Sequence, residues 1–353
     1  MMTQFDEVLF TENKGIGFIH LNRPKALNAL TSLMAAAIRD KLKSWQRDKG
    51  IKAVVVTGEG VRAFCAGGDV LRVIQSYKDG TDEWRDFFRN EYQMNVAIAE
   101  FTKPYISFVD GITMGGGVGV SIPGDFWVAS ENTLFAMPET GLGLFPDVGG
   151  SWFLPRLGGE MGMFLALTGA RLKTPDLYAL GIATHTIGSA DTEKTIEALM
   201  AADIKDNDDV DKVLKAFHQD PEPAPIMVYA DKIDDHFYQS SVENILNSLA
   251  QDTSEWAQKQ LSILQRHSPT SLKVTFEQLH RGLAVEKFRD SMQMEYCMVN
   301  HIMRGHDFAE GVRALLIDKD NSPRWSPATL DAVTPEMVMD HFKQSTDLVL
   351  DLP

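Results

Sequence analysis

The order in which short apolar strands, glycine-bearing turns and helices alternate most constrains the fold of this 353-residue chain. Continuous apolar runs at KAVVVTG (52–58) and YISFVDG (105–111) are typical of strands buried on both faces. AFCAGGD (63–69) reads as a strand edge that turns into a helix, and VLFTEN (8–13) with GIGFIHLN (15–22) alternates as a β-hairpin does. This recurrence predicts an α/β core that extends to about residue 200.

The second half of the chain has a different pattern, in which helical periodicity dominates. Its clearest helical segments are SVENILNSLA (241–250), PTSLKVTFEQLHRGL (269–283) and SMQMEYCMVNHIMRG (291–305). Before them, residues 203–225 form an acidic run that closes on prolines and is typical of a solvated connection. We therefore predict two regions, an α/β core over residues 1–202 and a mainly helical C-terminal region over residues 203–353.

Charge and hydropathy exclude several classes of partner. The formal net charge of −15 opposes phosphate backbones, so we expect no nucleic-acid partner. No apolar run approaches the roughly 18 residues of a membrane span, so we expect no membrane partner. The first ten residues, MMTQFDEVLF, carry acids and neither a basic patch nor an apolar signal core. We therefore expect a cytoplasmic location.

Common nucleophile, nucleotide and metal motifs are missing from the sequence. No G-x-S-x-G elbow or P-loop occurs, and residues 115–120 lack the last glycine of a dinucleotide fingerprint. Cys65 and Cys297 are far apart and have no C-x-x-C spacing, so we interpret both as buried thiols. His301, His306 and Asp307 do not share one helical face well, and we expect no metal site.

Two glycine-bearing stretches, CAGGD (65–69) and MGGGVGV (114–120), each follow an apolar strand and open a helix. Either stretch alone is typical of a tight turn, where glycine relieves strain. Together they indicate more, because two backbone N–H groups without shielding side chains can converge on one carbonyl oxygen. Such a pair stabilises the negative charge that develops on that oxygen. The pattern thus favours an oxyanion hole.

Glu139 and Asp147 lie in the stretch LFAMPETGLGLFPDVGG (134–150), surrounded by Phe, Met, Leu and Pro. Apolar surroundings raise the pKa of a carboxyl group and are typical of reactive acids. The alternative is that Glu139 caps a helix and Asp147 binds turn amides. The neighbouring glycine stretches favour the catalytic interpretation.

In these glycine and acid motifs the sequence resembles the crotonase, or enoyl-CoA hydratase/isomerase, superfamily. The motifs that carry the resemblance are NRPKALNAL (22–30), AFCAGGD, GITMGGGVGV (111–120) and MPETGLGLFPDVGG (137–150). The pairing of Glu139 with FPDVGG, and the later segment at 303–325, resemble the 3-hydroxyisobutyryl-CoA hydrolase branch. The resemblance implies a spiral of ββα turns followed by a helical C-terminal region that commonly mediates association, so a homo-oligomer is expected.

The same resemblance implies roles for individual residues. The N–H groups of Gly68 and Gly116 would form the oxyanion hole for a thioester carbonyl oxygen. Coenzyme A would be part of the substrate, with no separate cofactor, and Arg23 and Lys25 would offset its phosphate charge. The residues expected to contact the acyl-CoA substrate are Lys25, Ala26, Leu27, Ala66, Gly67, Asp69, Glu91 and Gly115. For Glu91 the alternative is an acid on the surface of a helix.

One departure from the family pattern concerns the reaction. Hydratases carry a second catalytic glutamate two positions after the triple glycine, and this chain has Gly119 there. The remaining acids favour hydrolysis, with Glu139 either attacking the thioester carbonyl or activating water. Asp147 would orient Glu139 or bind a substrate 3-hydroxyl.

The main hypothesis is therefore hydrolysis of a short 3-hydroxyacyl-CoA, 3-hydroxyisobutyryl-CoA of valine catabolism above others. One alternative is an enoyl-CoA isomerase or hydratase, because a single carboxylate can shuttle a proton between carbons. The other is a non-catalytic acyl-CoA-binding protein that keeps the fold as an interaction surface.

Overall fold

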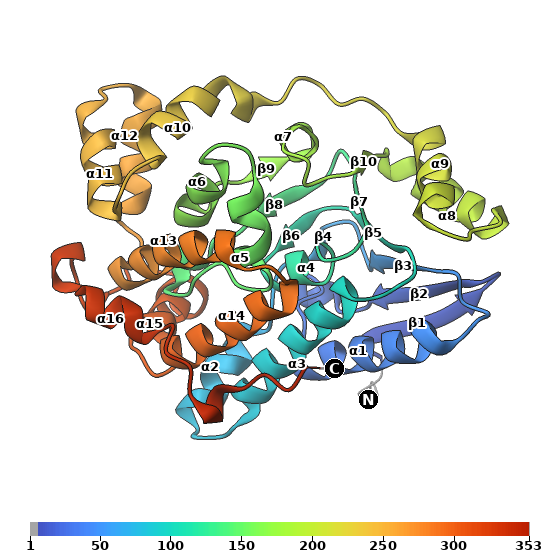
Figure 1. The fold of residues 1–353 in the computed structure, drawn as a ribbon, viewed down its shortest axis with the longest axis horizontal. Coiled ribbons are helices and arrows are strands. Elements are labelled where there is room, and N and C mark those ends of the chain that lie inside the picture. The colour runs from blue at the N-terminus through green and yellow to red at the C-terminus, as the bar shows by residue number, and fades with distance from the viewer. Residues whose placement is uncertain (1–5, 353) are drawn as a thin grey trace.

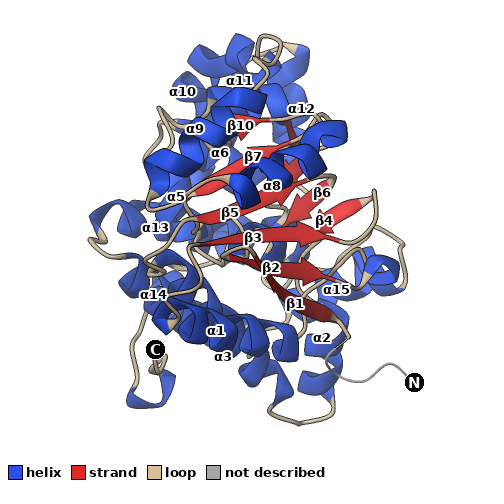
Figure 2. Ribbon diagram, turned by 90° about the vertical axis from the view of Figure 1, so that its right-hand side faces the viewer, coloured by secondary structure: helices blue, strands red, loops and turns tan. Residues whose placement is uncertain are grey.

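The computed structural model describes residues 6–352, in which the first 190 residues wind through two sheets. The strands are β1 (Val8–Asn13), β2 (Ile16–Leu21), β3 (Ala53–Gly58), β4 (Ala63–Cys65), β5 (Tyr105–Val109), β6 (Ile112–Met114), β7 (Phe126–Ala129), β8 (Leu134–Ala136), β9 (Leu172–Lys173) and β10 (His185–Thr186). The larger sheet has the order β1-β2-β3-β5-β7-β10, and the smaller sheet has the order β4-β6-β8-β9. Figure 2 shows the larger sheet with its strands in this order.

From β3 to β8, successive strands alternate between the two sheets. The chain passes from β3 to β4, from β5 to β6 and from β7 to β8, and each step leads from the larger sheet to the smaller one. The pairs β3–β5, β5–β7, β4–β6 and β6–β8 are all parallel, as crossover connections require. Only the hairpin β1–β2 and the pair β8–β9 are antiparallel among the described strands. The predicted spiral of ββα turns is confirmed.

Helices cover both sheets and make up the second half of the chain (Figure 1). They are α1 (Ser32–Arg47), α2 (Val70–Lys78), α3 (Glu83–Ala99), α4 (Gly116–Gly119), α5 (Gly150–Phe153), α6 (Met161–Thr168), α7 (Thr174–Ala179), α8 (Thr192–Ala201), α9 (Asn207–Phe217), α10 (Ala230–Phe237), α11 (Val242–Gln251), α12 (Glu255–Leu264), α13 (Pro269–Ala284), α14 (Phe288–Ile302), α15 (Asp307–Val312) and α16 (Pro335–Asp340). The three helical segments expected in the second half are confirmed as α11, α13 and α14. Within residues 6–352, no helix combines the length and apolar character needed to cross a bilayer.

The central strands of the larger sheet are buried on both faces, and their side chains alternate between two apolar clusters. Val54 and Val56 of β3 belong to the cluster that includes the inner side chains of α1 and α3. Ala53 and Val55 point the other way, into the cluster formed with α8 and α9. A period of two along the strand, with both sets apolar, explains why β3 reads as a continuous apolar run.

The acidic run at 203–225 differs from the expected solvated connection. Asp206 caps α9 by accepting hydrogen bonds from the N–H groups of Asp208 and Asp209. Val210 and Leu214 are buried one helical turn apart against the larger sheet. This part of the run is therefore an amphipathic helix whose acids lie on its outer face. Its high acid content is the reason that the sequence pattern indicated a solvated connection. The division of the chain at residue 203 stays a prediction, although α9 adds to the core of the preceding region.

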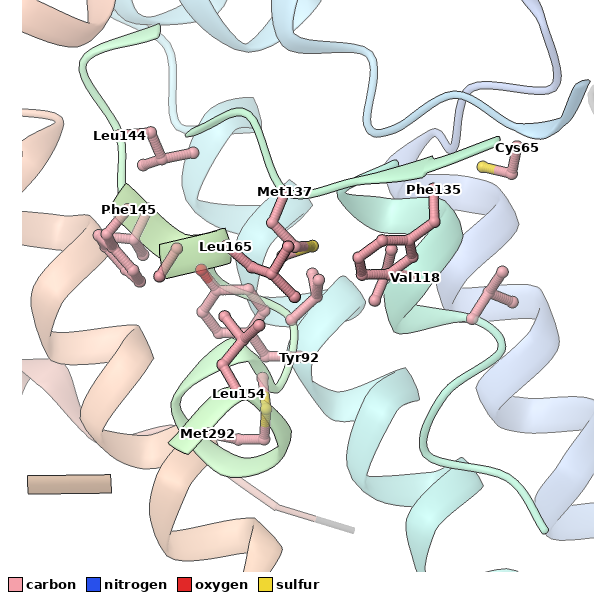
Figure 3. Close-up of a cluster of buried hydrophobic side chains, with 14 of the residues drawn as sticks. Cys65, Tyr92, Val118, Phe135, Met137, Leu144, Phe145, Leu154, Leu165 and Met292 are labelled. Atoms are coloured by element: carbon pink, nitrogen blue, oxygen red, sulfur yellow. The ribbon is translucent and has the colours of Figure 1, made fainter. Parts of the chain in front are cut away.

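The C-terminal helices pack where the small sheet ends. Helix α13 packs on α5 and α6, and α14 packs on α3 and α5 (Figure 1). Figure 3 shows the apolar cluster in this region, where Tyr92 of α3, Phe135 of β8 and Met292 of α14 lie together. Residues from both halves of the chain therefore share one core.

If α9 belongs to this core, Leu214→Ala should lower the free energy of unfolding by about 2–4 kcal/mol, because the side chain is fully buried. Lys212→Ala, on the exposed face of the same helix, is the matched control and should change it by less than about 0.5 kcal/mol. Urea unfolding followed by circular dichroism measures both. Equal effects of the two substitutions would show that α9 does not contribute to the core.

Candidate active site

The site forms where three parallel strands of the small sheet end side by side. Cys65 of β4 pairs with Thr113 of β6, and Met114 of β6 pairs with Ala136 of β8. Because the strands are parallel, the loops that follow them leave from the same edge. These loops carry the two glycine stretches and Glu139. The fold itself therefore brings together motifs that are about 70 residues apart in sequence.

The two glycine loops lie in direct contact. A Cβ atom built on Gly116 would lie 3.2 Å from the amide nitrogen of Gly68, and one on Gly115 would lie 3.7 Å from Cα of Gly67. Among the loop and turn hydrogen bonds of residues 6–352, neither the Gly68 N–H nor the Gly116 N–H is a donor. Two adjacent amides without protein acceptors are what an oxyanion hole requires.

Each glycine of the triple is needed at its position for a different physical reason. Gly115 has a φ of +45°, which side chains disfavour. A Cβ on Gly116 would lie 2.5 Å from Oε1 of Glu91, and a Cβ on Gly117 would lie 2.0 Å from the carbonyl oxygen of Cys65. Gly117 thus serves close backbone packing, whereas Gly116 leaves room beside a carboxylate.

Three predicted acids reach this place from different elements. Glu139 begins the 3₁₀ helix η2 (Glu139–Leu142), and its Oε1 lies 3.1 Å from the position of a Cβ on Gly115. Glu139, Glu91 and Asp147 are only 5%, 2% and 5% exposed. Oε2 of Glu139 and Oε1 of Glu91 have no hydrogen-bond partner among the described residues. The site therefore holds carboxylate oxygens that are buried and free to act.

Asp147 has a partner on helix α3. The hydroxyl of Tyr92 donates a hydrogen bond of 2.8 Å to Oδ2 of Asp147. Tyr92 follows Glu91 in the helix and is itself fully buried. One helical segment thus contributes an acid to the site and orients a second one.

A fourth acid, Glu295 of α14, comes from the C-terminal region and is fully buried. Its Oε2 accepts the N–H of Gly149 at 3.0 Å, and its Oε1 accepts the N–H of Ser151 at 3.0 Å. The Ser151 hydroxyl also donates to Oε1. Glu295 therefore binds the loop that follows Asp147.

Burial raises the pKa of all four carboxyl groups. For Glu139 the charge of Asp147 adds to the effect of burial, and for Glu91 the charges of Asp147, Glu295 and Glu139 do so. Burial also raises the pKa of Asp147, against the opposing effect of the Tyr92 hydrogen bond. Burial, with the charge of Asp147, raises the pKa of Glu295 to about 8. The four groups therefore keep protons that exposed acids lose, and they do not all ionise together at neutral pH.

Comparison with known proteins agrees with this arrangement. The sequence model of the family described as enoyl-CoA hydratase/isomerase matches residues 16–342. The chain belongs to this family. It is 46% identical to the mitochondrial 3-hydroxyisobutyryl-CoA hydrolase of Rattus norvegicus over 346 residues, which cover 97% of this chain and 90% of the relative. It is 47% identical to that of Danio rerio over 351 residues, covering 98% and 92%. The predicted resemblance to the crotonase superfamily and its 3-hydroxyisobutyryl-CoA hydrolase branch is confirmed.

Solved structures of the family have the same fold. A carnitinyl-CoA dehydratase from Mycobacterium thermoresistibile superposes with a TM-score of 0.92 at 35% identity, covering 98% of this chain and 99% of that one. An enoyl-CoA hydratase from Rhodobacter sphaeroides gives 0.91 at 35% identity, covering 98% and 100%. The crotonase-like fold of the chain therefore extends over nearly its whole length.

The segment expected to hold coenzyme A lies along the first glycine loop of this crotonase-family protein. The N–H of Ala66 donates to the carbonyl of Leu27 at 3.0 Å, and the N–H of Leu30 donates to that of Gly67 at 2.9 Å. Lys25 and Ala26 are exposed beside it. Contact of these residues with coenzyme A stays a prediction.

Arg23 and Asp69 are engaged with the protein. Arg23 pairs with Glu7 at 3.1 Å and with Asp69 at 3.0 Å, and it also donates to the carbonyl of Ala29. Asp69 additionally caps α2 by accepting the N–H of Arg72. Two acids already neutralise the Arg23 guanidinium, so the charge that we expected it to offer phosphates is used within the fold. Substrate contact by Asp69 stays a prediction.

The burial of Glu91 and Cys65 tests two further interpretations of the sequence. Glu91 is buried, so its alternative as a surface acid is wrong. Cys65 is confirmed as a buried thiol, and burial raises its pKa to about 12, which makes it a poor nucleophile. Tyr92 and Glu295 were missed. The signal for Glu295 was an acid between Met292 and Val299 on the buried face of a helix.

The raised pKa of Glu139 makes its ionisation costly for the fold. When the pKa of a carboxyl group is higher in the folded state than in the unfolded state, ionisation of that group destabilises the fold. The free energy of unfolding then falls as the pH rises from the unfolded-state pKa, near 4, through the folded-state pKa. Glu139→Gln should therefore raise the free energy of unfolding by about 1–3 kcal/mol at pH 8 and by less at pH 5. Urea unfolding at both pH values measures this, with exposed Glu197→Gln as the control. A gain that is equal at the two pH values would contradict the raised pKa.

Proposed function

We propose that this protein hydrolyses the thioester of a short 3-hydroxyacyl-CoA, namely 3-hydroxyisobutyryl-CoA, to 3-hydroxyisobutyrate and coenzyme A. The observation that carries the proposal is the buried carboxyl group of Glu139, which lies against Gly115 of the triple glycine and has one oxygen without a hydrogen-bond partner among the described residues. The neighbouring Gly116 lies against the amide of Gly68. The relatives named as 3-hydroxyisobutyryl-CoA hydrolases support the choice of substrate.

The surroundings of Gly119 favour hydrolysis over hydration. A Cβ on Gly119 would lie 2.6 Å from Cβ of Val148 and 2.8 Å from Nδ2 of Asn95. Asn95 also donates a hydrogen bond to the carbonyl of Gly119 at 2.8 Å. The place of the second hydratase glutamate is thus filled by packed side chains. Addition of water to a double bond by two acids would lack one of its partners.

In the proposed reaction, the thioester carbonyl oxygen accepts hydrogen bonds from the N–H groups of Gly68 and Gly116. These donors stabilise the charge that develops on that oxygen when the carbonyl carbon is attacked. Removing one such donor typically costs about 100-fold to 1,000-fold in kcat in acyl-transfer enzymes. The fixed amides therefore supply several kilocalories per mole of transition-state stabilisation.

Glu139 acts on the carbonyl carbon by one of two routes. In the direct route its carboxylate forms a bond to that carbon, the C–S bond breaks, and the coenzyme A thiolate takes a proton from a neighbouring acid; water then hydrolyses the anhydride. In the other route Glu139 takes a proton from water, and the water oxygen forms a bond to the same carbon. The C–S bond then breaks, and the coenzyme A thiolate takes a proton from an acid of the site. Both routes need Glu139 ionised and a second, protonated acid, and a cluster with raised pKa values supplies both forms.

Asp147 and Glu91 would recognise the acyl group. Tyr92 fixes the orientation of Asp147, so this carboxylate can accept a hydrogen bond from a substrate 3-hydroxyl. A buried acceptor that is left unpaired costs free energy, and acyl groups without the hydroxyl would therefore bind poorly.

Location and assembly remain proposals. The relatives are named as mitochondrial proteins, so they do not support the expected cytoplasmic location. Association into a homo-oligomer through the C-terminal region also stays a prediction.

A thiol-release assay on 3-hydroxyisobutyryl-CoA tests the proposed function. Glu139→Gln should lower kcat by at least about 1,000-fold with an unchanged circular dichroism spectrum, because the amide neither attacks carbon nor takes a proton. Isobutyryl-CoA, which lacks the hydroxyl, should give a kcat/KM at least about 10-fold lower. Glu197→Gln is the matched control and should retain full turnover.

Other outcomes would assign another function. Double-bond migration in an enoyl-CoA without thiol release would identify an isomerase. Binding of every short-chain ester without turnover would favour a non-catalytic acyl-CoA-binding protein. Unchanged turnover in Glu139→Gln would remove this residue from the mechanism.

A further inference from the structure

The loop that carries Asp147, residues 146–151, is held from outside by the two long C-terminal helices. Gln278 of α13 donates a hydrogen bond of 2.6 Å to the carbonyl of Pro146 at the start of the loop. Glu295 of α14 accepts the N–H groups of Gly149 and Ser151 at its end. We call residues 146–151 the Asp147 loop.

The backbone of the Asp147 loop is strained at its centre. Val148 has a φ of +51° and Gly149 has a φ of +98°, so two consecutive residues lie in the left-handed region. A β-branched residue rarely adopts such a conformation, and it persists only where surrounding contacts impose it. The side chain of Val148 is buried and packs over Gly119. Outside partners must therefore stabilise this loop.

Glu295 is the polar partner with the most hydrogen bonds to the loop. Both of its carboxylate oxygens are used, and all three bonds go to Gly149 or Ser151. Among the described residues, no Lys or Arg forms an ion pair with Glu295. Ionisation of a buried carboxyl group without a cation is costly, and the three donated hydrogen bonds offset that cost only in the observed loop conformation.

We infer that Glu295 is a positioning residue that holds the Asp147 loop in its strained turn and thereby aims Asp147 at the reacting centre beside Glu139. Tyr92 donates a hydrogen bond to the carboxylate of Asp147, and Glu295 accepts one from the backbone two residues further on, at Gly149. The effect on turnover rests on the proposed function, whereas the effect on the loop does not.

Glu295→Gln tests this role, because an amide has one acceptor oxygen and places an NH₂ group against a backbone N–H donor. We expect kcat for thiol release to fall at least about 10-fold while KM stays within about 3-fold, because the segment beside the first glycine loop is untouched. Amide hydrogen exchange at Gly149 and Ser151 should become at least about 10-fold faster than in the unmodified protein.

Asp176→Asn is the matched control. Asp176 is also a buried carboxylate that accepts two backbone N–H groups, from Lys173 at 3.3 Å and Ile226 at 2.9 Å, but it lies outside the site. It should speed exchange at its own partners and leave kcat per folded molecule unchanged. An equal loss of kcat in both variants would show that Glu295 is merely structural.

A second variant covers the case in which Glu295→Gln does not fold. Ser151→Ala removes one of the three donors and leaves the carboxylate in place, so it should lower kcat about 3-fold and speed exchange at Gly149. Unchanged exchange at Gly149 and Ser151 in a folded variant would overturn the inference. If the unmodified protein releases no thiol, the proposed function fails, and the exchange measurements alone decide whether Glu295 holds the loop.

Discussion

Parallel pairing of three short strands is the constraint on which the rest of this structure depends. Strands β4, β6 and β8 have three residues each, yet their register places the ends of all three at one edge. The first glycine loop, the triple glycine and Glu139 follow those ends directly. A shift of one residue in this register would turn Thr113 and its neighbours to the opposite face and separate the amides from the acid.

The site gathers four carboxyl groups where they are buried, and this has two opposite effects. Burial makes each carboxylate costly, so the cluster keeps protons and weakens the fold as the pH rises. The same burial gives Glu139 a higher basicity and leaves neighbouring acids protonated, and both states serve thioester cleavage. Hydrogen bonds from Tyr92 and from the Ser151 segment offset part of the cost. The buried acids that the reaction requires thus lower the free energy of unfolding of the protein.

The sequence predicted much of this structure, because each motif of the core and of the site lies within one short stretch of the chain. The apolar runs at 52–58 and 105–111 predicted buried strands, which the structure places at 53–58 and 105–109. The glycines of the site, Glu139 and Asp147 each lie in a motif that one short stretch of sequence contains. Tyr92 and Glu295 were missed because their partners lie 55 and 146 residues away in the chain. No periodicity reports which loop a buried helical acid will face. Helix α9 was missed for another reason, because the acids on its outer face outweighed two buried apolar positions.

The fold alone does not decide the reaction, since a hydratase and a dehydratase of known structure superpose on this chain with TM-scores of 0.91 and 0.92. In the hydratase pattern a second catalytic glutamate stands where this chain has Gly119. In this chain Val148 occupies that space, and it does so in a left-handed conformation that the bonds at Asp147 and Gly149 stabilise. Loss of the second glutamate and the strained turn after Asp147 are thus two aspects of one packing arrangement. A glutamate at 119 would require Val148 to move, and Asp147 is its neighbour in the chain. The geometry therefore couples the absence of one acid to the placement of another, which is how a shared scaffold comes to favour cleavage of a thioester over addition to a double bond.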